Sequence, residues 1–450
     1  MASTAWQRFP PAWPASAAES EKPVAARWAS MISTSDKAAT DERVLYVGMY
    51  LPEAPSPIPV GLLTLGRRGV TEYGGFEYGR RYRVQDGAIA LNPAFMPTGT
   101  AAFGFPPRRL RDGGALNLTF KDSLPDAWGE LVLRYENNWK PLSADEMLLK
   151  TNENRVGALV FSPTRAMPPA SPGTKRVRLE DLAEAARCLA FEMEVPKELK
   201  RLLVKDGTLG GARPKASLVR DAALWIAKFP AKDDEVDVQV LEACTLRLAG
   251  LCDIRVAQFK REPLQKINAL LVRRFDRPGT VKDGHRIHYL SAAAFTDSPY
   301  DSNQGSYVGL ASQLRVHGSM VSRDLPELFR RLVFNVLIDN TDDHVKNHGV
   351  LHTGRNLYEL SPAFDMVPQL TNLGYMGMAI AEGRETPHLD TVLDVAGHFG
   401  LSRATATATI KRIREVVAGW KAVFVAEGAD RQLLQRVEHC FKEQQKIVTS

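Results

Sequence analysis

The sequence predicts an α+β protein with a β-rich N-terminal part and a mainly helical C-terminal part. Residues 44–51 are dense in β-branched and aromatic side chains, and residues 59–79 hold strand-like runs broken by glycine, as in a hairpin or meander. Residues 326–340 show the apolar spacing of an amphipathic helix, and the last hundred residues look largely helical. At 450 residues the chain is expected to form two or three packed units.

The composition is that of a globular protein, with 44% hydrophobic and 24% charged residues. It excludes wholesale disorder, a collagen repeat and a disulfide scaffold. The net charge of +6 permits contact with phosphate-rich partners without requiring it. The four cysteines show no CxxC spacing, which indicates reduced thiols in a cytoplasmic protein. Apolar runs stay far below the roughly 18 residues of a membrane span, and the first twenty residues do not form a secretory signal.

Composition and periodicity divide the chain into five segments. We expect, in order, a flexible extension, a β-rich subdomain, a Pro- and Gly-containing linker, a mixed lobe and a helical lobe, at residues 1–40, 41–165, 166–178, 179–290 and 291–450.

The elements expected within these segments follow from local pattern. Ser123 or Asp126 is positioned to cap a helix that contains Trp128. A second helix is expected to carry Pro326 in its first turn. The remaining expected elements are a strand at 155–163, a helix at 179–193, two strands around a turn at 220–221, a helix at 236–251 and a strand at 269–277.

The segment 337–351 is the strongest candidate for a functional site. It follows an apolar helix, and seven polar and charged side chains lie within the ten positions 339–348, namely Asp339, Asp342, Asp343, His344, Lys346, Asn347 and His348. A merely solvated helix end would not require this density or the apolar Gly349–Leu351 that closes it. Two chemistries are compatible with these residue types.

A metal hydrolase is the first alternative. His344, His348 and His352 recur every four residues and would align as three metal ligands if the stretch were helical. Gly349 and the apolar pair after it instead indicate a return into a strand, which would take His352 out of the row.

Phosphoryl transfer is the second alternative. Asp342 and Asn347 have the spacing of a catalytic carboxylate, which accepts a hydroxyl proton, and an amide that holds Mg²⁺. Asp365 follows at the end of an apolar stretch and supplies a second metal-binding carboxylate. Mg²⁺ prefers such hard oxygen ligands when it binds nucleotide phosphates.

A phosphate-binding loop and a lysine precede these residues in the order that a kinase requires. Gly210 and Gly211 lie just before a predicted strand, and glycine lets backbone N–H groups approach phosphate closely. Lys228 follows near the end of a strand, and Glu242 lies on the next predicted helix. The order of loop, lysine, glutamate, catalytic Asp and Asn, and metal Asp favours phosphoryl transfer.

The chain resembles the HipA family of bacterial serine/threonine kinases, the toxins of type II toxin–antitoxin pairs. The resemblance runs from about Val44 to the C-terminus. It is carried by SLPDAWGELVLRY (123–135), RVGALVF (155–161), GGARPKASL (210–218), RRFDR (273–277), NVLIDNTDDHVKNHGV (335–350) and LSPAFDMVP (360–368).

The resemblance implies a two-lobed kinase-like fold with an N-terminal β-rich subdomain, and it implies roles for individual residues. Asp342 would be the catalytic base, Asn347 and Asp365 would hold Mg²⁺, and Lys228, supported by Glu242, would contact the phosphates. The ATP site would be lined by Gly210, Gly211, Ala212, Arg213, Lys215, His344, Lys346 and Asn347. Thr208 stands where the family has the serine that is autophosphorylated.

The resemblance also implies partners. A HipB-like helix-turn-helix antitoxin would bind the chain, and DNA contact would occur only through that complex. The substrate would be a protein hydroxyl, as in the aminoacyl-tRNA synthetases that family members modify, and its modification would inhibit growth. The alternative is a catalytically weak subunit that acts mainly as binding partner and co-repressor. Asp342 and Asp365 are both present, which favours activity.

Overall fold

The computed structural model describes residues 41–52, 54, 56–110, 113–151, 154–168, 177–203, 211–299, 305–371 and 373–446. The predicted N-terminal extension, most of the predicted linker, Thr208 and Gly210 lie outside the described residues.

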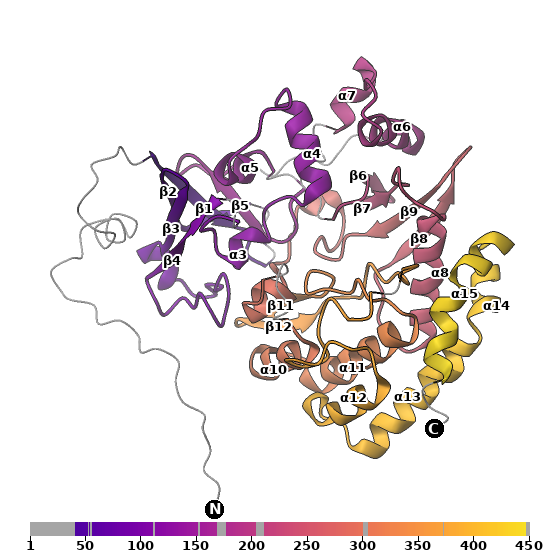
Figure 1. The fold of residues 1–450 in the computed structure, drawn as a ribbon. Helices are drawn as coiled ribbons and strands as arrows, with labels where there is room; N and C mark the ends of the chain where they lie inside the picture. The colour runs from indigo at the N-terminus through magenta and orange to yellow at the C-terminus, as the bar shows by residue number, and fades with distance from the viewer. Residues whose placement is uncertain are drawn as a thin grey trace, which may run out of the picture.

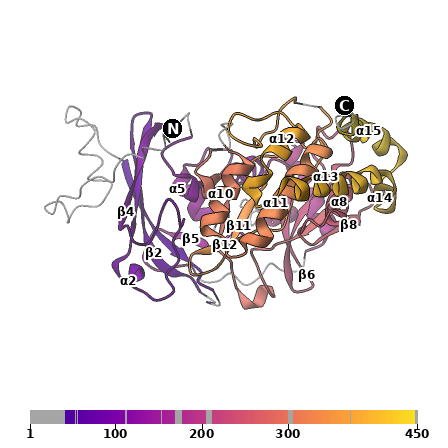
Figure 2. The same ribbon diagram turned by 90° about the horizontal axis from the view of Figure 1, so that it is seen from below.

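The N-terminal part is built on an antiparallel sheet with strand order β4-β3-β2-β1-β5. Its strands are β1 (Asp41–Met49), β2 (Ile58–Arg68), β3 (Thr71–Tyr78), β4 (Ala102–Arg109) and β5 (Leu159–Ser162). Its helices are α2 (Arg80–Arg83), α3 (Leu118–Lys121), α4 (Ala127–Glu136) and α5 (Ala144–Lys150). Phe76, Phe120 and Phe161 are buried against one another in its core. Figures 1 and 2 show this sheet at one end of the molecule.

The middle of the chain forms a second antiparallel sheet with order β6-β7-β9-β8. Its strands are β6 (Lys215–Arg220), β7 (Ala223–Lys228), β8 (Phe259–Pro263) and β9 (Asn268–Arg273), and its helices are α6 (Leu179–Ala190), α7 (Lys197–Leu203) and α8 (Val238–Leu251). The β6–β7 turn lies at Asp221 and Ala222, both with positive φ, one residue later than predicted. The sheet packs its apolar face against α6 through residues such as Leu182, Ala186 and Trp225.

The C-terminal part surrounds a short sheet of order β10-β11-β12 with helices. The strands are β10 (Tyr289–Ser291), β11 (Gly349–Gly354) and β12 (Leu357–Leu360). The helices are α9 (Ala292–Thr296), α10 (Tyr307–His317), α11 (Val321–Leu337), α12 (Leu389–Asp394), α13 (Arg403–Ala418), α14 (Trp420–Ala426) and α15 (Arg431–Lys446), with 3₁₀ turns η2 (Val281–Asp283) and η3 (Ala396–Phe399). Figure 2 shows α11 enclosed by its neighbours. The predicted α+β class is confirmed.

Three local predictions were wrong in detail. Helix α11 begins at Val321, so Pro326 is its sixth residue rather than part of its first turn. The earlier start is stabilised by Asp324, whose carboxylate accepts a hydrogen bond from the Leu360 backbone N–H at 2.8 Å. Strand β9 ends at Arg273 rather than at 277, and the last hundred residues include the β11–β12 hairpin and irregular stretches at 361–371 and 373–388.

A buried charge cluster joins the N-terminal part to the second sheet. The carboxylate of Asp276 accepts hydrogen bonds from Arg274 at 2.7 Å, from Arg277 at 2.6 Å and from the backbone N–H of Gly157 at 2.8 Å. Arg274 also donates to the Asn154 carbonyl at 2.7 Å. The two arginines hold the pKa of Asp276 well below its usual range despite its burial, which alone would raise that pKa. Strand β9 leaves the sheet after Arg273 because these side chains turn toward residues 154–157.

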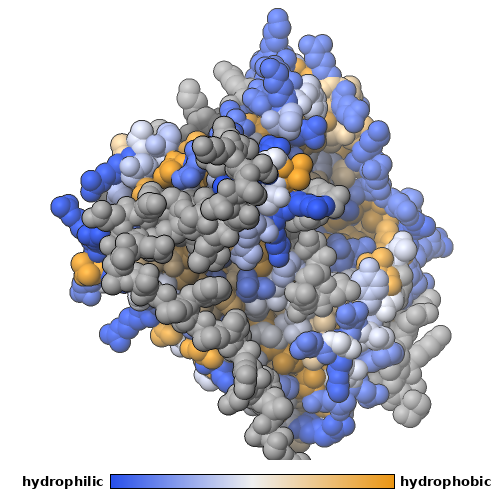
Figure 3. All heavy atoms as spheres, turned by 60° about the vertical axis from the view of Figure 1, so that its left-hand side comes forward, coloured by the Kyte–Doolittle hydropathy of each residue, from blue (hydrophilic) through white to orange (hydrophobic). Residues whose placement is uncertain are grey.

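Among the coloured residues of Figure 3, hydrophilic ones are the more numerous, and hydrophobic ones occur in separate patches. Within the described ranges, no helix combines the length and the apolar character that crossing a bilayer would require.

Candidate active site

Lys228, Glu242 and Asp365 meet at one point of the structure. Lys228 ends β7, Glu242 lies on α8, and Asp365 lies in the loop after β12. The Lys228 Nζ is 2.7 Å from Glu242 Oε1 and 2.8 Å from Asp365 Oδ1. The Glu242 side chain is 4% exposed, whereas that of Asp365 is 46% exposed. Glu242 can therefore anchor the lysine from the protein side while Asp365 stays accessible to a bound ligand.

The charges of this cluster reinforce one another. Burial alone would lower the pKa of Lys228, but Asp365 and Glu242 outweigh it and raise that pKa above its ordinary value. Lys228 in turn holds the pKa of Asp365 well below its usual range. At neutral pH the site thus contains a fixed ammonium beside an ionised carboxylate.

Lys215 adds a second cation to the same place. It lies directly opposite Lys228 in the antiparallel β6–β7 pair, and it is buried. Burial, and then the charge of Lys228, lower the pKa of Lys215 to about 8. Gly211 has a φ of +93° beside it, and a Cβ there would collide with the Lys215 ammonium. The positive φ therefore favours glycine at 211, and the Lys215 ammonium, at the end of a flexible side chain, would have to move to admit a Cβ.

The loop between α11 and β11 holds two neighbouring aspartates that face opposite ways. Asp342 is exposed, whereas Asp343 is buried. Asp343 accepts a hydrogen bond from the Tyr307 hydroxyl and lies 3.0 Å from His348 Nε2, and Asn335 donates to Tyr307 at 2.9 Å. This buried network fixes the loop backbone and leaves Asp342 pointing outward.

Asp342 is close enough to Asp365 for their charges to interact. Burial raises the pKa of Asp342, His344 opposes that rise, and Asp365 reinforces it. The pairing of a carboxylate of raised pKa with one of lowered pKa gives the two groups different chemical characters.

The geometry contradicts the metal-hydrolase alternative. The residues from 344 to 348 form turns, and Gly349 begins β11, so His344, His348 and His352 do not share a helix face. His348 is engaged by Asp343. Among the residues described, no group of three or more His, Cys, Asp or Glu is arranged to hold a metal ion. Asn347 and Asp365 instead offer oxygen ligands of the kind that suits Mg²⁺ bound together with phosphates.

Two further predicted residues, Lys346 and Arg213, form ion pairs with aspartates that the sequence analysis did not include in the site. Lys346 forms an ion pair with Asp126, which also accepts a hydrogen bond from the Gly211 N–H at 2.6 Å. Arg213 forms an ion pair with Asp234. Asp126 occupies the N-cap position of α4, as predicted, yet its side chain makes no capping bond to that helix. Nothing in the local pattern indicates these contacts, because they join residues 220 and 85 positions apart.

Ala212 and Asn347 lie on the two loops of the candidate site, before β6 and before β11. Ala212 is exposed at the turn before β6. Asn347 is buried, and its backbone N–H donates to the His344 carbonyl at 2.8 Å, which folds the loop back on itself.

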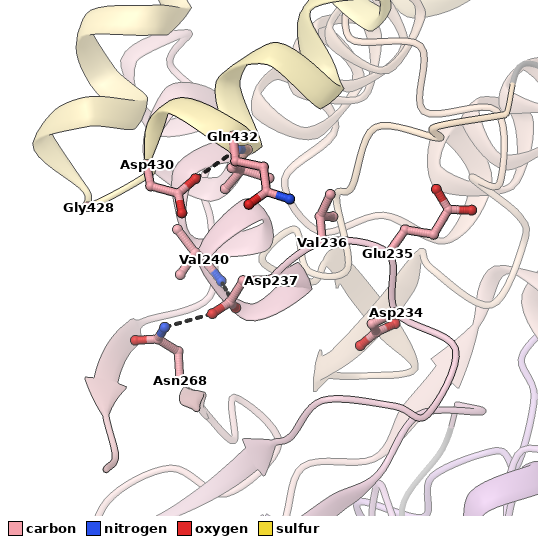
Figure 4. Close-up of a pocket in the computed structure, with 10 residues that line it drawn as sticks. Asp234, Glu235, Val236, Asp237, Val240, Asn268, Gly428, Asp430 and Gln432 are labelled. Carbon is pink, nitrogen blue, oxygen red and sulfur yellow. Dashed lines mark hydrogen bonds between the residues drawn. The ribbon is translucent and has the colours of Figure 1, made fainter. Parts of the chain in front are cut away.

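A separate hollow of about 310 Å³ lies between the start of α8 and the α14–α15 turn (Figure 4). Acidic side chains that line it form hydrogen bonds that stabilise the surrounding elements. Asp237 accepts hydrogen bonds from the Val240 N–H at 3.0 Å and from Asn268 at 2.6 Å, and Asp430 caps α15 through the Leu433 N–H at 2.7 Å. This hollow lies between the second sheet and the C-terminal helices, and none of the predicted site residues lines it.

The chain is similar in sequence to known proteins. Residues 207–420 match the family model of the HipA-like C-terminal domain. The curated protein "Putative kinase Y4dM" of Sinorhizobium fredii is 25% identical over 229 residues, which cover 47% of this chain and 54% of that protein. The chain thus spans about half the length of this relative.

One solved structure extends the likeness over most of the chain. A chain of the Shewanella oneidensis MR-1 complex of HipA, HipB and operator DNA superposes with a TM-score of 0.63 at 19% identity, covering 88% of this chain and 95% of that one. The Helicobacter pylori proinflammatory kinase CtkA gives a TM-score of 0.37 at 12% identity, with coverage of 52% and 90%.

The fold is therefore that of a kinase-like α+β protein, as predicted, with an N-terminal antiparallel sheet and a helical C-terminal region. Residues 207–420 form a HipA-like C-terminal domain, which confirms the resemblance that the motifs indicated.

Proposed function

We propose that this protein is an ATP-dependent serine/threonine protein kinase of HipA type. The observation that carries the proposal is the position of the Lys228 ammonium between the buried Glu242 and the half-exposed Asp365. Kinases require this arrangement, in which a lysine fixed by a glutamate contacts phosphates beside a metal-binding aspartate.

Each residue of the candidate site has its own role in the proposed reaction. The substrate hydroxyl oxygen forms a bond to the γ-phosphorus while the bond from that phosphorus to the bridging oxygen of ADP breaks. Asp342, the outward-facing carboxylate, accepts the hydroxyl proton. Lys228 and Lys215 offset the phosphate charge. Asn347 and Asp365 would hold Mg²⁺, which supplies charge neutralisation to the phosphates.

We propose a toxin role with a protein partner. The Shewanella structure contains HipB and operator DNA. By analogy this chain would bind a helix-turn-helix antitoxin, contact DNA through that complex and inhibit growth when the antitoxin is absent. Its substrate would be a protein hydroxyl, and aminoacyl-tRNA synthetases are the first candidates to test.

Labelled ATP tests the proposal directly. Purified protein with Mg²⁺ is expected to label itself, and Asp342→Ala is expected to abolish labelling with unchanged circular dichroism. Labelling that persists in Asp342→Ala would place the base elsewhere, and no labelling with any divalent metal would contradict kinase activity. Mass spectrometry of the labelled protein and of Thr208→Ala tests autophosphorylation at Thr208.

Expression in growing cells separates the two functional alternatives. Growth arrest by the wild type but not by Asp342→Ala would support a toxic kinase. A stable complex with the antitoxin, without transfer or growth arrest, would support the catalytically weak binding partner.

A further inference from the structure

The first turn of α4, although it belongs to the N-terminal part of the chain, contacts both loops of the candidate ATP site. The Asp126 carboxylate accepts a hydrogen bond from the Gly211 N–H at 2.6 Å through Oδ2 and forms an ion pair with Lys346 through Oδ1. Each oxygen therefore holds one of the two loops that precede β6 and β11.

Trp128 fixes the same backbone from the next positions of the helix. Its N–H donates to the Gly211 carbonyl at 3.3 Å, and its indole Nε1 donates to the Lys215 carbonyl at 2.8 Å. The ring is 2% exposed and packs in the core beside β6. Asp126 and Trp128 thus hold the backbone at both ends of the stretch 211–215.

A third contact ties this segment to the C-terminal part. The Asp122 carboxylate accepts hydrogen bonds from the Ser291 N–H at 2.7 Å and from the Ser291 hydroxyl at 2.6 Å. Residues 122–128 therefore touch β10, the loop before β11 and the loop before β6. The sequence predicts the start of a helix in this segment and assigns the segment no role in the candidate site.

We propose that Asp126 and Trp128 form a brace that positions Gly211 and Lys346 for the nucleotide phosphates. The two are positioning residues, since they act through the loop and the lysine rather than on the nucleotide. The inference rests on the proposed kinase function. A loop whose ends are already fixed loses less conformational entropy when it closes on a phosphate, so the brace increases ATP affinity.

The charge of Asp126 is needed for this role. Burial disfavours its carboxylate, but Lys346 and the Gly211 N–H outweigh it and keep the pKa of Asp126 below its ordinary value. An asparagine could accept from Gly211 or face Lys346, but its NH₂ group would then oppose a donor on the other side. Asp126→Asn is therefore the variant that breaks the brace with the least change of volume.

Hydrogen exchange on nucleotide-free protein tests the brace without reference to activity. In Asp126→Asn we expect the Gly211 amide to exchange about tenfold faster or more, because it loses a charge-assisted bond. The matched control is Asp145→Asn, which removes a comparable ion pair with Arg43 at 2.9 Å within the N-terminal part. Equal exchange at Gly211 in wild type and Asp126→Asn would overturn the proposal.

A tryptophan pair provides a second route if Asp126→Asn does not fold. Trp128→Phe removes the indole bond to Lys215, and Trp225→Phe removes the equivalent bond to the Arg220 carbonyl, 3.2 Å long, at the other end of β6. We expect faster exchange over 211–215 in the first variant and not in the second. Equal exchange in both would show that Trp128 acts only as core.

Measurements of nucleotide binding test whether the brace affects the affinity of the site for ATP. Calorimetric titration with ATP and Mg²⁺ is expected to show about tenfold weaker binding in Asp126→Asn than in Asp145→Asn, and the KM for ATP should rise by the same factor while kcat changes by less than about threefold. A wild type that binds no ATP would contradict the proposed function, whereas the exchange experiment would still decide the brace. Unchanged ATP affinity with faster exchange would overturn the positioning role.

Discussion

Lys228 and Asp365 are joined by a 2.8 Å hydrogen bond although 137 positions separate them in the sequence. The bond connects the end of β7 to the loop after β12, and Glu242 holds the same ammonium from α8. The central cation of the candidate site is therefore shared by two carboxylates, one buried and one accessible.

Replacement of Lys228 is expected to impair both transfer and stability. In Lys228→Met the site loses its phosphate-directed cation, and transfer should fall by about 10²–10³-fold. Glu242 becomes an unpaired buried charge, which should lower the free energy of unfolding by about 3 kcal/mol. Labelled-ATP kinetics and urea unfolding measure the two effects.

The matched control is Lys260→Met on strand β8 of the same sheet. Lys260 pairs with Glu262 at 2.9 Å but is 58% exposed, so its loss should change stability by less than about 1 kcal/mol and leave transfer intact. Similar results for the two lysines would show that Lys228 forms an ordinary surface pair.

Glu242→Gln is expected to raise the Mg²⁺ requirement. Without the Glu242 carboxylate, Asp365 becomes the remaining partner of Lys228, so the lysine competes more strongly with Mg²⁺ for that carboxylate. A titration of transfer rate against Mg²⁺ should show a higher half-saturating concentration than in the wild type. An unchanged Mg²⁺ dependence with unchanged rate would show that Glu242 does not anchor the lysine.

The adjacent Asp342 and Asp343 should give opposite phenotypes. Asp342 is exposed, so Asp342→Asn should reduce transfer by about 10²–10⁴-fold while the free energy of unfolding stays within about 0.5 kcal/mol. Asp343 is buried with Tyr307 and His348. Asp343→Asn should therefore cost about 2–4 kcal/mol of stability. Thermal unfolding and single-turnover kinetics check both, and a reversal of the two phenotypes would mean that Asp343 faces the substrate.

Asp276→Asn is expected to loosen the N-terminal part from the rest of the molecule. Arg274 and Arg277 would both lose their shared negative charge, and the NH₂ group of asparagine would face one of the donors that the carboxylate now accepts from. We expect a loss of about 3–5 kcal/mol, with unfolding in two steps by circular dichroism. Asp145→Asn, whose ion pair lies within the N-terminal part, is the control, and a single unshifted transition in Asp276→Asn would contradict the prediction.

Two buried histidines should make the protein less stable in acid. Burial lowers the pKa of His288 and of His352 to about 4, against about 6.5 in an unfolded chain. Between pH 6.5 and about 4 the unfolded chain therefore binds protons that the folded protein excludes, so the free energy of unfolding falls as the pH is lowered through this window.

His288→Gln isolates this effect. His288 Nε2 lies 2.9 Å from the Leu91 carbonyl, and glutamine can keep a donor there without titrating. Asp122, whose pKa burial raises to about 6, acts with the opposite sign but is present in both proteins, so the difference between them removes it. Urea unfolding from pH 7 to pH 4 should give a shallower loss of stability in the variant. Parallel curves would contradict the assignment.

The elements of the fold could be predicted in large part because their signals are local. The apolar period of residues 326–337, the β-branched and aromatic run of residues 44–51, and the glycines before β6 all act within a few residues. The exceptions, such as the early start of α11, occur where a distant group intervenes. Asp324 bonds to Leu360, 36 positions away, and no local window contains that partner.

The sequence by itself determined which side chains can carry phosphoryl transfer, because Lys228, Glu242, Asp342, Asn347 and Asp365 occur in the order that this chemistry uses. The tertiary structure alone decided how they are arranged: Asp342 outward and Asp343 inward, and Asp126 on Gly211 and Lys346 rather than on its own helix. The physical reason is that residue type fixes what a group can do, whereas burial, charge and hydrogen bonding depend on neighbours that only chain packing brings together.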